Sequence, residues 1–292
     1  MNRSEVNYKL RIAFCLTLLP LFQSCGLKNV FFDFAADLVP PEMIRSIDQQ
    51  GWQEISSQRV VLNSPEANAL LEKLAQPILQ RITAPAGVEW QFHVIVSPEL
   101  NAFALPGGTI GINSGLILSS STGNELLGVI AHEIGHVTEQ HGLNSVITQT
   151  GLSVAFSLFL GEADELTRIA VGQLSRLGLL KFSRDQEREA DRVGSLTLQQ
   201  AQLPSEGLHD FFARFANRRS DQSIFMRKAE GLLSTHPVSE ERARYLKNLA
   251  QENPHDSMPA SLQQLNESLK SVVYQRLSNE QQATHSKVRN IF

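Results

Sequence analysis

The feature that most constrains this chain is a pair of histidines four residues apart, His132 and His136, with Glu133 directly after the first. Residues 124–141 around them carry a one-sided apolar pattern that predicts a single helix. Residues four apart on a helix lie one turn above each other, so both imidazoles point to one place. Two neutral imidazoles at this spacing can hold a zinc ion, and the neighbouring carboxylate can act as a base on water.

This helix should begin with Asn124 as its cap and stop at Gly142. We expect His141 to be a surface residue at the helix end that points away from the metal. The short motif alone also fits two surface histidines and an ordinary helical glutamate, since it arises by chance in about one chain in a hundred of this length. The remaining parts of a catalytic site must therefore be found elsewhere.

Residues 1–24 have the pattern of a signal peptide, because basic residues are followed by an apolar run too short to cross a bilayer. The residues before Cys25 resemble a bacterial lipobox, so we expect cleavage and lipidation at Cys25, with ordinary signal-peptide cleavage as the alternative. The only other cysteine, Cys15, lies inside the signal, which leaves Cys25 without a disulfide partner. Gly26 after the lipidated cysteine favours an outer membrane.

A candidate peptide-binding strand precedes the histidine helix. Residues 90–96 alternate as a strand, and Pro106-Gly107 suits a tight turn before a further strand at 109–112. A short strand with few large polar groups beside a metal helix can be the sheet edge along which a peptide lies. An ordinary hairpin fits the spacing equally well. The candidate substrate-binding residues are Asn101, Ala102, Phe103 and Ala104.

A catalytic zinc usually takes a third protein ligand and leaves one position to water. The candidate segment is Ser183–Gly194, where Glu187 and Asp191 share one helix face. Glu187 can supply a carboxylate to zinc, and Asp191 can accept the free ring N–H of a ligand histidine. A solvated charged helix is the alternative, although apolar residues leading into this segment indicate that it is partly buried.

Four motifs in this order resemble those of one zinc endopeptidase family. They are His-Glu-Ile-Gly-His, the preceding Asn-Ala-Phe-Ala-Leu-Pro-Gly-Gly, the later segment Ser183–Gly194, and Thr235-His236-Pro237 followed by Arg242. Together they are similar to the gluzincin family that includes HtpX, the CAAX prenyl proteases and the periplasmic proteases BepA and LoiP. The resemblance covers roughly residues 60–250 and is far more specific than any single motif.

The resemblance implies a set of roles at the site. It implies zinc ligands His132, His136 and Glu187, with Glu133 as catalytic base and Asp191 and Arg242 supporting the ligands. For His236 two roles remain: a hydrogen-bond donor to the oxyanion, or a residue that fills the open zinc position in the resting enzyme. We expect the donor role, with the second limited to the resting state. Simple capping of the next helix is the structural alternative.

These observations predict an α+β, mostly helical zincin-type fold with a small β-sheet, whose edge strand lies beside the histidine helix. The predicted organisation is a signal peptide at 1–24, a lipidated N-terminal arm or linker at 25–59, a zinc metallopeptidase domain at 60–250, and a C-terminal helical tail at 251–292. A helical hairpin is expected between residues 143 and 181, and one amphipathic helix at 261–277 in a tail that is partly disordered.

The expected function is a zinc-dependent endopeptidase with one zinc per chain, anchored by lipid on the periplasmic face of a bacterial membrane. Its expected partners are unfolded or misassembled envelope proteins and envelope assembly factors. The chain has 292 residues and a net charge of −4 with no basic block, so nucleic acid is not an expected partner. The alternatives are a chaperone-like envelope lipoprotein and a zinc-stabilised structural domain, although neither requires a base such as Glu133.

Overall fold

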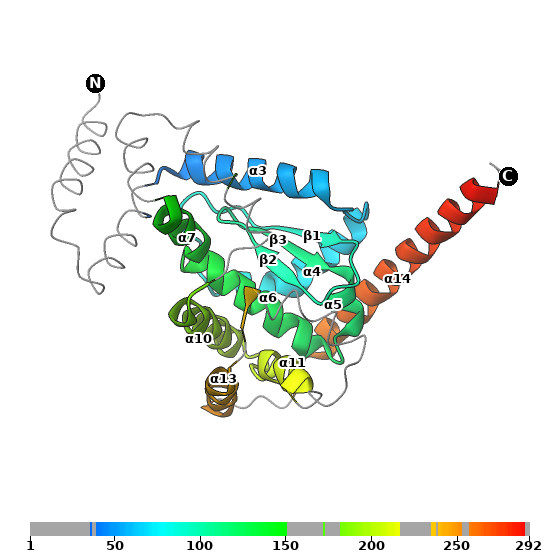
Figure 1. Ribbon diagram of the computed structural model, residues 1–292. Coiled ribbons are helices and arrows are strands. Elements are labelled where there is room, and N and C mark those ends of the chain that lie inside the picture. Colours follow the sequence, from blue (N-terminus) through cyan, green and yellow to red (C-terminus); the bar gives the residue numbers. More distant parts are fainter. Residues whose placement is uncertain are drawn as a thin grey trace, which may run out of the picture.

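The computed structural model describes residues 36, 39–150, 172, 182–216, 235–237, 239–252 and 257–289. The signal segment, Cys25 and most of the expected hairpin before residue 181 lie outside the described residues. The described part is α+β and mostly helical, with one small sheet, which confirms the predicted fold class (Figure 1). None of its helices combines the length and apolarity that a bilayer crossing requires.

The sheet contains β1 (Gln91–Ile95), β2 (Ala102–Ala104) and β3 (Thr109–Asn113), in the order β1-β3-β2. The central strand β3 runs parallel to β1 and antiparallel to β2, with Phe103 opposite Gly111. Helix α5 (Ser114–Ser119) follows β3 directly. The short strand β2 is thus an edge of the described sheet, and it contacts the histidine-bearing helix α6 (Gly123–Thr138), as predicted.

Both faces of the sheet are buried, because alternate side chains enter two different cores. Phe92, Ile110 and Ile112 join the main core with α4 (Pro65–Leu79) and α6. Ile95 and Phe103 point to the other side, where they meet α3 (Pro41–Gln58) and α7 (His141–Thr150). The sheet therefore lies between α3 on one side and α4 with α6 on the other (Figure 1).

Helix α3 lies within the segment expected as an N-terminal arm or linker, and residues 41–58 of that segment form one continuous helix that packs on the sheet. The buried carboxylate of Asp48 accepts hydrogen bonds from the backbone N–H groups of Gly107 (2.8 Å) and Thr109 (3.3 Å). The Thr109 hydroxyl donates to the same carboxylate at 2.5 Å. Asp48 thereby provides hydrogen-bond acceptors for the backbone N–H groups of the turn between β2 and β3. It also connects α3 to the hairpin that carries the candidate substrate strand.

The predicted ends of the histidine helix are wrong at both termini. Thr122, not Asn124, is the cap, and its hydroxyl accepts the backbone N–H of Glu125 at 3.3 Å. The helix ends at Thr138 rather than at Gly142, because Gln140 adopts a left-handed conformation with φ 53°. The chain turns there, and His141 begins the separate helix α7.

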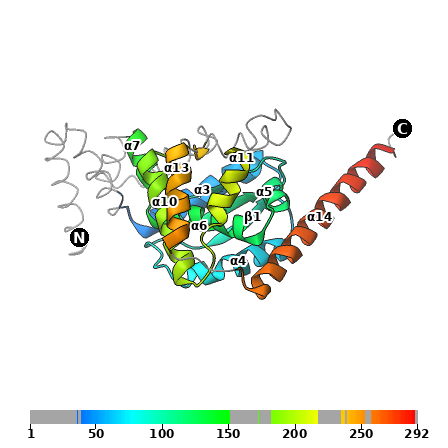
Figure 2. The same cartoon turned by 90° about the horizontal axis from the view of Figure 1, so that it is seen from below.

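Helix α10 (Arg184–Gln200) crosses α6, and α11 (Gly207–Ala216) and α13 (Glu240–Glu252) lie beside this pair (Figure 2). Ser183 caps α10 in a reciprocal capping box with Gln186. The α6 and α10 backbones touch at two glycines. A Cβ on Gly135 would lie 2.7 Å from the Ala190 carbonyl oxygen, and one on Gly194 would lie 2.9 Å from that of Ala131.

The C-terminal helix α14 (Ala260–Arg289) is longer than the expected 261–277 segment. Its first half packs against α4 and α5 through Leu262, Leu269 and Val273, which are buried. Its second half extends away from the body of the molecule (Figure 1). From Ala260 on, the described tail is therefore one continuous helix.

The contact between α6 and α10 predicts a large stability loss for Gly135→Ala. The added methyl group meets the rigid backbone of α10, so the helices must separate, which we expect to cost about 1–3 kcal/mol. Gly123→Ala is the matched control in the same helix, because its methyl group would meet the movable sulfur of Met258. Urea unfolding of both variants measures the difference. Equal midpoints would show that α10 moves away from α6 without cost.

Candidate metal centre

Four buried side chains from three segments converge on one point. They are His132 and His136 of α6, Glu187 of α10 and His236 of the segment before α13, and one ligand atom of each lies within 4.8 Å of the others. The two α6 histidines bring their Nε2 atoms to 3.0 Å from each other. Nδ1 of His236 lies 2.9 Å from Oε1 of Glu187 and 3.2 Å from Nε2 of His132.

The other ring nitrogens of the two α6 histidines also have close neighbours. Nδ1 of His132 lies 2.9 Å from a carboxylate oxygen of Asp191, and Nδ1 of His136 lies 3.0 Å from Nδ1 of His141. If both Nδ1 atoms carry the proton and donate it, both Nε2 atoms are bare lone pairs 3.0 Å apart. Two such acceptors beside a carboxylate repel each other, and a cation placed between them removes the repulsion. The donor set therefore fits a metal ion.

The charges of the buried site lead to the same conclusion. Glu133, Glu187 and Asp191 are three buried carboxylates, and Arg242 is the buried cation that faces them. A buried group in which carboxylates outnumber guanidinium groups is a favourable environment for a metal cation. Burial lowers the pKa of His136 well below its ordinary value, and the neighbouring histidines add to the effect, so the imidazole stays in its neutral, metal-binding form.

Asp191 and Arg242 form a support for His132 and Glu187. The Arg242 guanidinium donates from Nε and Nη2 to the two oxygens of Asp191, both at 2.8 Å, and its Nη1 lies 2.5 Å from Oε2 of Glu187. Burial alone would raise the pKa of Asp191, but the Arg242 charge and hydrogen bonds outweigh burial and lower it to about 2. Asp191 is thus ionised and can accept the N–H of His132.

The pKa values of Glu187 and His236 shift in opposite directions. Burial raises the pKa of Glu187, but the charges of His236, His132 and Arg242 outweigh it, and the net pKa is lowered. Burial lowers the pKa of His236, but Glu133 and Glu187 outweigh it, and the net pKa is raised. Both shifts favour the charged forms of the pair, a carboxylate on Glu187 and an imidazolium on His236, whose atoms lie 2.9 Å apart.

The expectation that His141 is a surface residue is wrong, since its side chain is only about 2% exposed. The left-handed turn at Gln140 breaks the predicted helix and directs His141 back toward His136. On one continuous helix a residue five positions on would point elsewhere. The left-handed residue is a glutamine, and the nearest stop signal, Gly142, lies two residues after it, so the sequence did not place the break before His141.

Glu133 is buried beside the converging group, with 1% of its surface exposed. Its Oε1 lies 3.5 Å from Nε2 of His236. Neither carboxylate oxygen has a hydrogen-bond partner among the residues that the structure describes. A buried carboxylate without such partners costs folding free energy, so its presence beside four convergent ligand atoms calls for an explanation in function.

The candidate substrate residues lie on the sheet edge, but three of the four side chains are buried. The Leu105 N–H donates to the Thr109 carbonyl, and the Asn113 N–H donates to the Asn101 carbonyl. The backbone groups of Asn101 and Leu105 therefore face β3. In an antiparallel pair the intervening residues, Ala102 and Ala104, direct their N–H and C=O groups outward. The N–H of Ala102 donates to the side chain of Asn101 at 3.0 Å.

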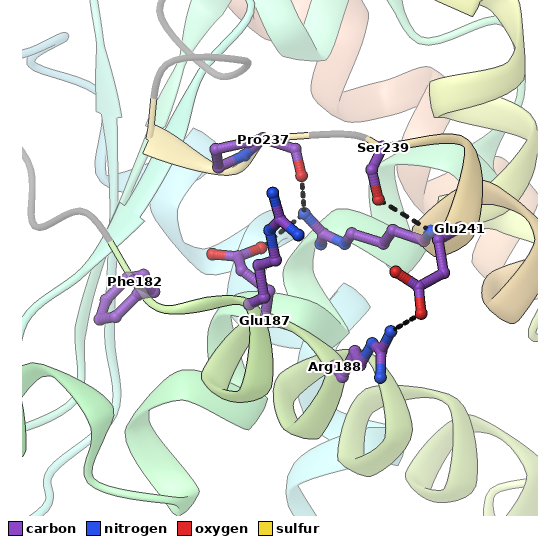
Figure 3. A pocket seen from close by; sticks show the side chains of 8 residues that line it. Phe182, Glu187, Arg188, Pro237, Ser239 and Glu241 are labelled. Atoms are coloured by element: carbon purple, nitrogen blue, oxygen red, sulfur yellow. Dashed lines mark hydrogen bonds and ion pairs between the residues drawn. The ribbon is translucent and has the colours of Figure 1, made fainter. Parts of the chain in front are cut away.

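A pocket of about 280 Å³ adjoins the converging group on the side of α10 and α13 (Figure 3). Glu187 forms part of its wall, and Pro237 and Ser239 form another part. Arg188 is paired with Glu241 at its rim, as the dashed line in Figure 3 shows. The pocket therefore reaches one of the four convergent side chains, Glu187.

Comparison with known proteins agrees with this geometry. The profile of "Peptidase family M48" matches residues 65–250. A beta-barrel assembly-enhancing protease of Yersinia pestis is 30% identical over 64% of this chain and 40% of its own length. The metalloprotease LoiP of Escherichia coli (strain K12) is 28% identical over 74% of this chain and 83% of its own length.

The mitochondrial metalloendopeptidase OMA1 of Schizosaccharomyces pombe is 31% identical over 57% of this chain and 49% of its own length. This chain spans about two fifths of the length of the beta-barrel assembly-enhancing proteases that it matches. The family profile, in contrast, covers well over half of this chain, including α6, α10 and α13. The chain therefore belongs to peptidase family M48, a family of zinc metalloendopeptidases.

Proposed function

We propose that this chain is a zinc-dependent endopeptidase whose metal ligands are His132, His136 and Glu187. The observation that carries the proposal is the buried convergence of these three side chains beside Glu133, whose carboxylate has no hydrogen-bond partner among the described residues. Three protein ligands with a base next to them match the needs of a hydrolytic zinc site, which keeps one position open. The catalytic domain would span residues 60–250, and the family match to 65–250 supports that span.

Zinc, when bound, supplies Lewis acidity toward the scissile carbonyl and toward the attacking water. Glu133 takes the proton of that water and delivers it to the leaving amine. Asp191 and Arg242 hold His132 and Glu187 in position. The Asp191 carboxylate, which faces His132, is itself fixed by two hydrogen bonds from the Arg242 guanidinium. His236 stabilises the oxyanion by a hydrogen bond after it leaves the position that it holds in the described structure.

The substrate peptide lies along β2, where the outward C=O of Ala102 and both outward backbone groups of Ala104 are available for strand addition, while the N–H of Ala102 is bonded to Asn101. The contact between β2 and α6 supports this position, because it brings an added strand next to the histidines. Asn101 and Phe103 act through the shape of the strand, since their own side chains are buried. Such binding requires extended backbone, so unfolded or misassembled proteins are the proposed substrates.

Two other functions compete with proteolysis. In a zinc-stabilised structural domain His236 would close the coordination as a fourth ligand, and its Nδ1 is close enough to the other ligand atoms to do so. In a chaperone-like lipoprotein the fold would bind proteins without cleaving them. Neither function uses Glu133, and burying a carboxylate that has no hydrogen-bond partner in the described part of the chain destabilises a fold that gains nothing from it.

We propose that the protein acts in the bacterial envelope, anchored by lipid on Cys25 at the periplasmic face of a membrane, with an outer membrane favoured. The lipobox-like residues before Cys25 support the anchor. Relatives named as beta-barrel assembly-enhancing proteases support a setting among envelope assembly factors.

The first prediction separates zinc binding from catalysis. Glu133→Gln should keep about one zinc per chain and lose cleavage of an unfolded protein, because the amide cannot accept the proton of water. His132→Ala and Glu187→Ala should instead lower zinc affinity. Metal analysis and a gel-based cleavage assay on the same preparations provide both readouts. Cleavage by Glu133→Gln at the parent rate would refute the assignment of the base.

The second prediction concerns His236→Ala. We expect zinc to be retained and turnover to fall by about a hundredfold or more, as for the loss of an oxyanion donor. A rise in basal cleavage would mean instead that His236 only closes the site in the resting enzyme. His209→Ala is the control, since His209 lies on α11 and pairs with Asp210. If His236→Ala matches this control in zinc content and rate, the residue has only a structural role.

The third prediction concerns the anchor. Mass spectrometry of the mature chain should find lipid on Cys25, and fractionation should recover the protein with membranes. Cys25→Ser should release the protein from membranes, because a serine hydroxyl cannot form the thioether bond to the lipid. An unmodified N-terminus on a parent protein that fractionates with soluble proteins would rule out the anchor.

A further inference from the structure

The two α6 histidines are supported in different ways, and only one support follows from the motifs. His132 faces the ionised Asp191, which Arg242 holds from behind. His136 has no carboxylate at its Nδ1 among the described residues, and the atom 3.0 Å away is Nδ1 of His141. Because His141 is buried and is the first residue of α7, its position relative to His136 is fixed by the fold.

We infer that His141 is a positioning residue that fixes the tautomer and ring orientation of His136 for metal binding. This inference rests on the proposed zinc site and adds a residue to it. When Nε2 of His136 faces the metal as an acceptor, its Nδ1 must carry the proton and donate it. Nδ1 of His141 is then the acceptor, which makes His141 the neutral tautomer protonated at Nε2.

A third residue is consistent with this tautomer of His141. Nε2 of His141 lies 3.5 Å from Oε2 of Glu189, which can accept its N–H when the contact tightens. In the series His136–His141–Glu189, each residue therefore donates to the next. The series ends at the Glu189 carboxylate, which is about half exposed. Phe182 stacks on a face of the His136 ring at a centroid distance of 3.9 Å and restricts its rotation.

His141 is not a metal ligand in this arrangement, because its Nδ1 faces His136 and the convergent group contains His236 in its place. It acts only through His136. Residues that hold a ligand histidine in this way typically change metal affinity by 10- to 100-fold when they are removed. If His141 served only to pack, the size of its ring would matter more than its nitrogen atoms. A substitution that keeps a ring would then preserve zinc affinity better than one that keeps only an acceptor atom.

Two substitutions at His141 separate the hydrogen bond from packing. His141→Phe keeps a ring of similar size but removes the acceptor. His141→Asn loses the ring but keeps an acceptor oxygen close to the position of Nδ1. His93→Phe is the control, because His93 is an imidazole stacked on Trp52 in β1, two strands away from the edge that contacts α6.

The measurement is the zinc dissociation constant of the full chain, obtained by competition with a chromophoric chelator, together with the visible spectrum of the Co²⁺ form. We expect His141→Phe to weaken zinc binding by about 10- to 100-fold and to alter the Co²⁺ spectrum, with His141→Asn close to the parent. Unfolding curves recorded with chelator show whether each metal-free variant is folded. Equal zinc affinity in His141→Phe, or a greater loss in His141→Asn, would overturn the inference.

The outcome is distinct from failure of the proposed function. If the parent chain itself bound no zinc, the proposed site would be wrong. If the parent binds zinc and cleaves while His141→Phe keeps its zinc affinity and Co²⁺ spectrum, only the positioning role is wrong.

Discussion

The metal centre depends on the backbone contact between α6 and α10. Two of the convergent ligand atoms belong to α6 and one to α10, and their distances follow from how closely the helix axes approach. Helices usually lie 8–10 Å apart, as set by the side chains between them. Here Gly135 and Gly194 remove those side chains, so main chain meets main chain. Each glycine weakens its own helix by about 1 kcal/mol relative to alanine, and the fold accepts this loss at the point where the ligands meet.

The close approach also forces charged groups into the interior. Carboxylates and a guanidinium at these distances from one another would destabilise the core if any were left alone. Arg242 reaches both Asp191 and Glu187 from α13, so one residue compensates two carboxylates on α10 and ties a third helix to the site. Because α13 lies late in the chain, the site is complete only when segments far apart in sequence have assembled.

Much of the site could be predicted from short-range spacing, and the rest depends on how the chain turns. His132, His136, Glu187 and Asp191 follow from the four-residue period of a helix, and the structure places them together. His141 could not be predicted, because its position results from one left-handed residue that has no glycine signature. The small sheet was predicted, but the role of α3 was not: the bonds of Asp48 to the β2–β3 turn join residues about 60 positions apart.

In the proposed binding mode, the edge of β2 also determines which peptides can be selected. Ala102 already uses its N–H within the strand, whereas both outward groups of Ala104 have no hydrogen-bond partner in the described part of the chain. An added peptide is therefore aligned mainly by its hydrogen bonds to the N–H and C=O of Ala104. These bonds set the register of the peptide independently of its side chains. A proline at the peptide position that donates to Ala104 cannot make this bond, because it lacks an N–H. Such an edge binds extended peptides with free backbone groups and does not bind strands that are already paired in a sheet. It accepts almost any peptide sequence that has no proline at this position.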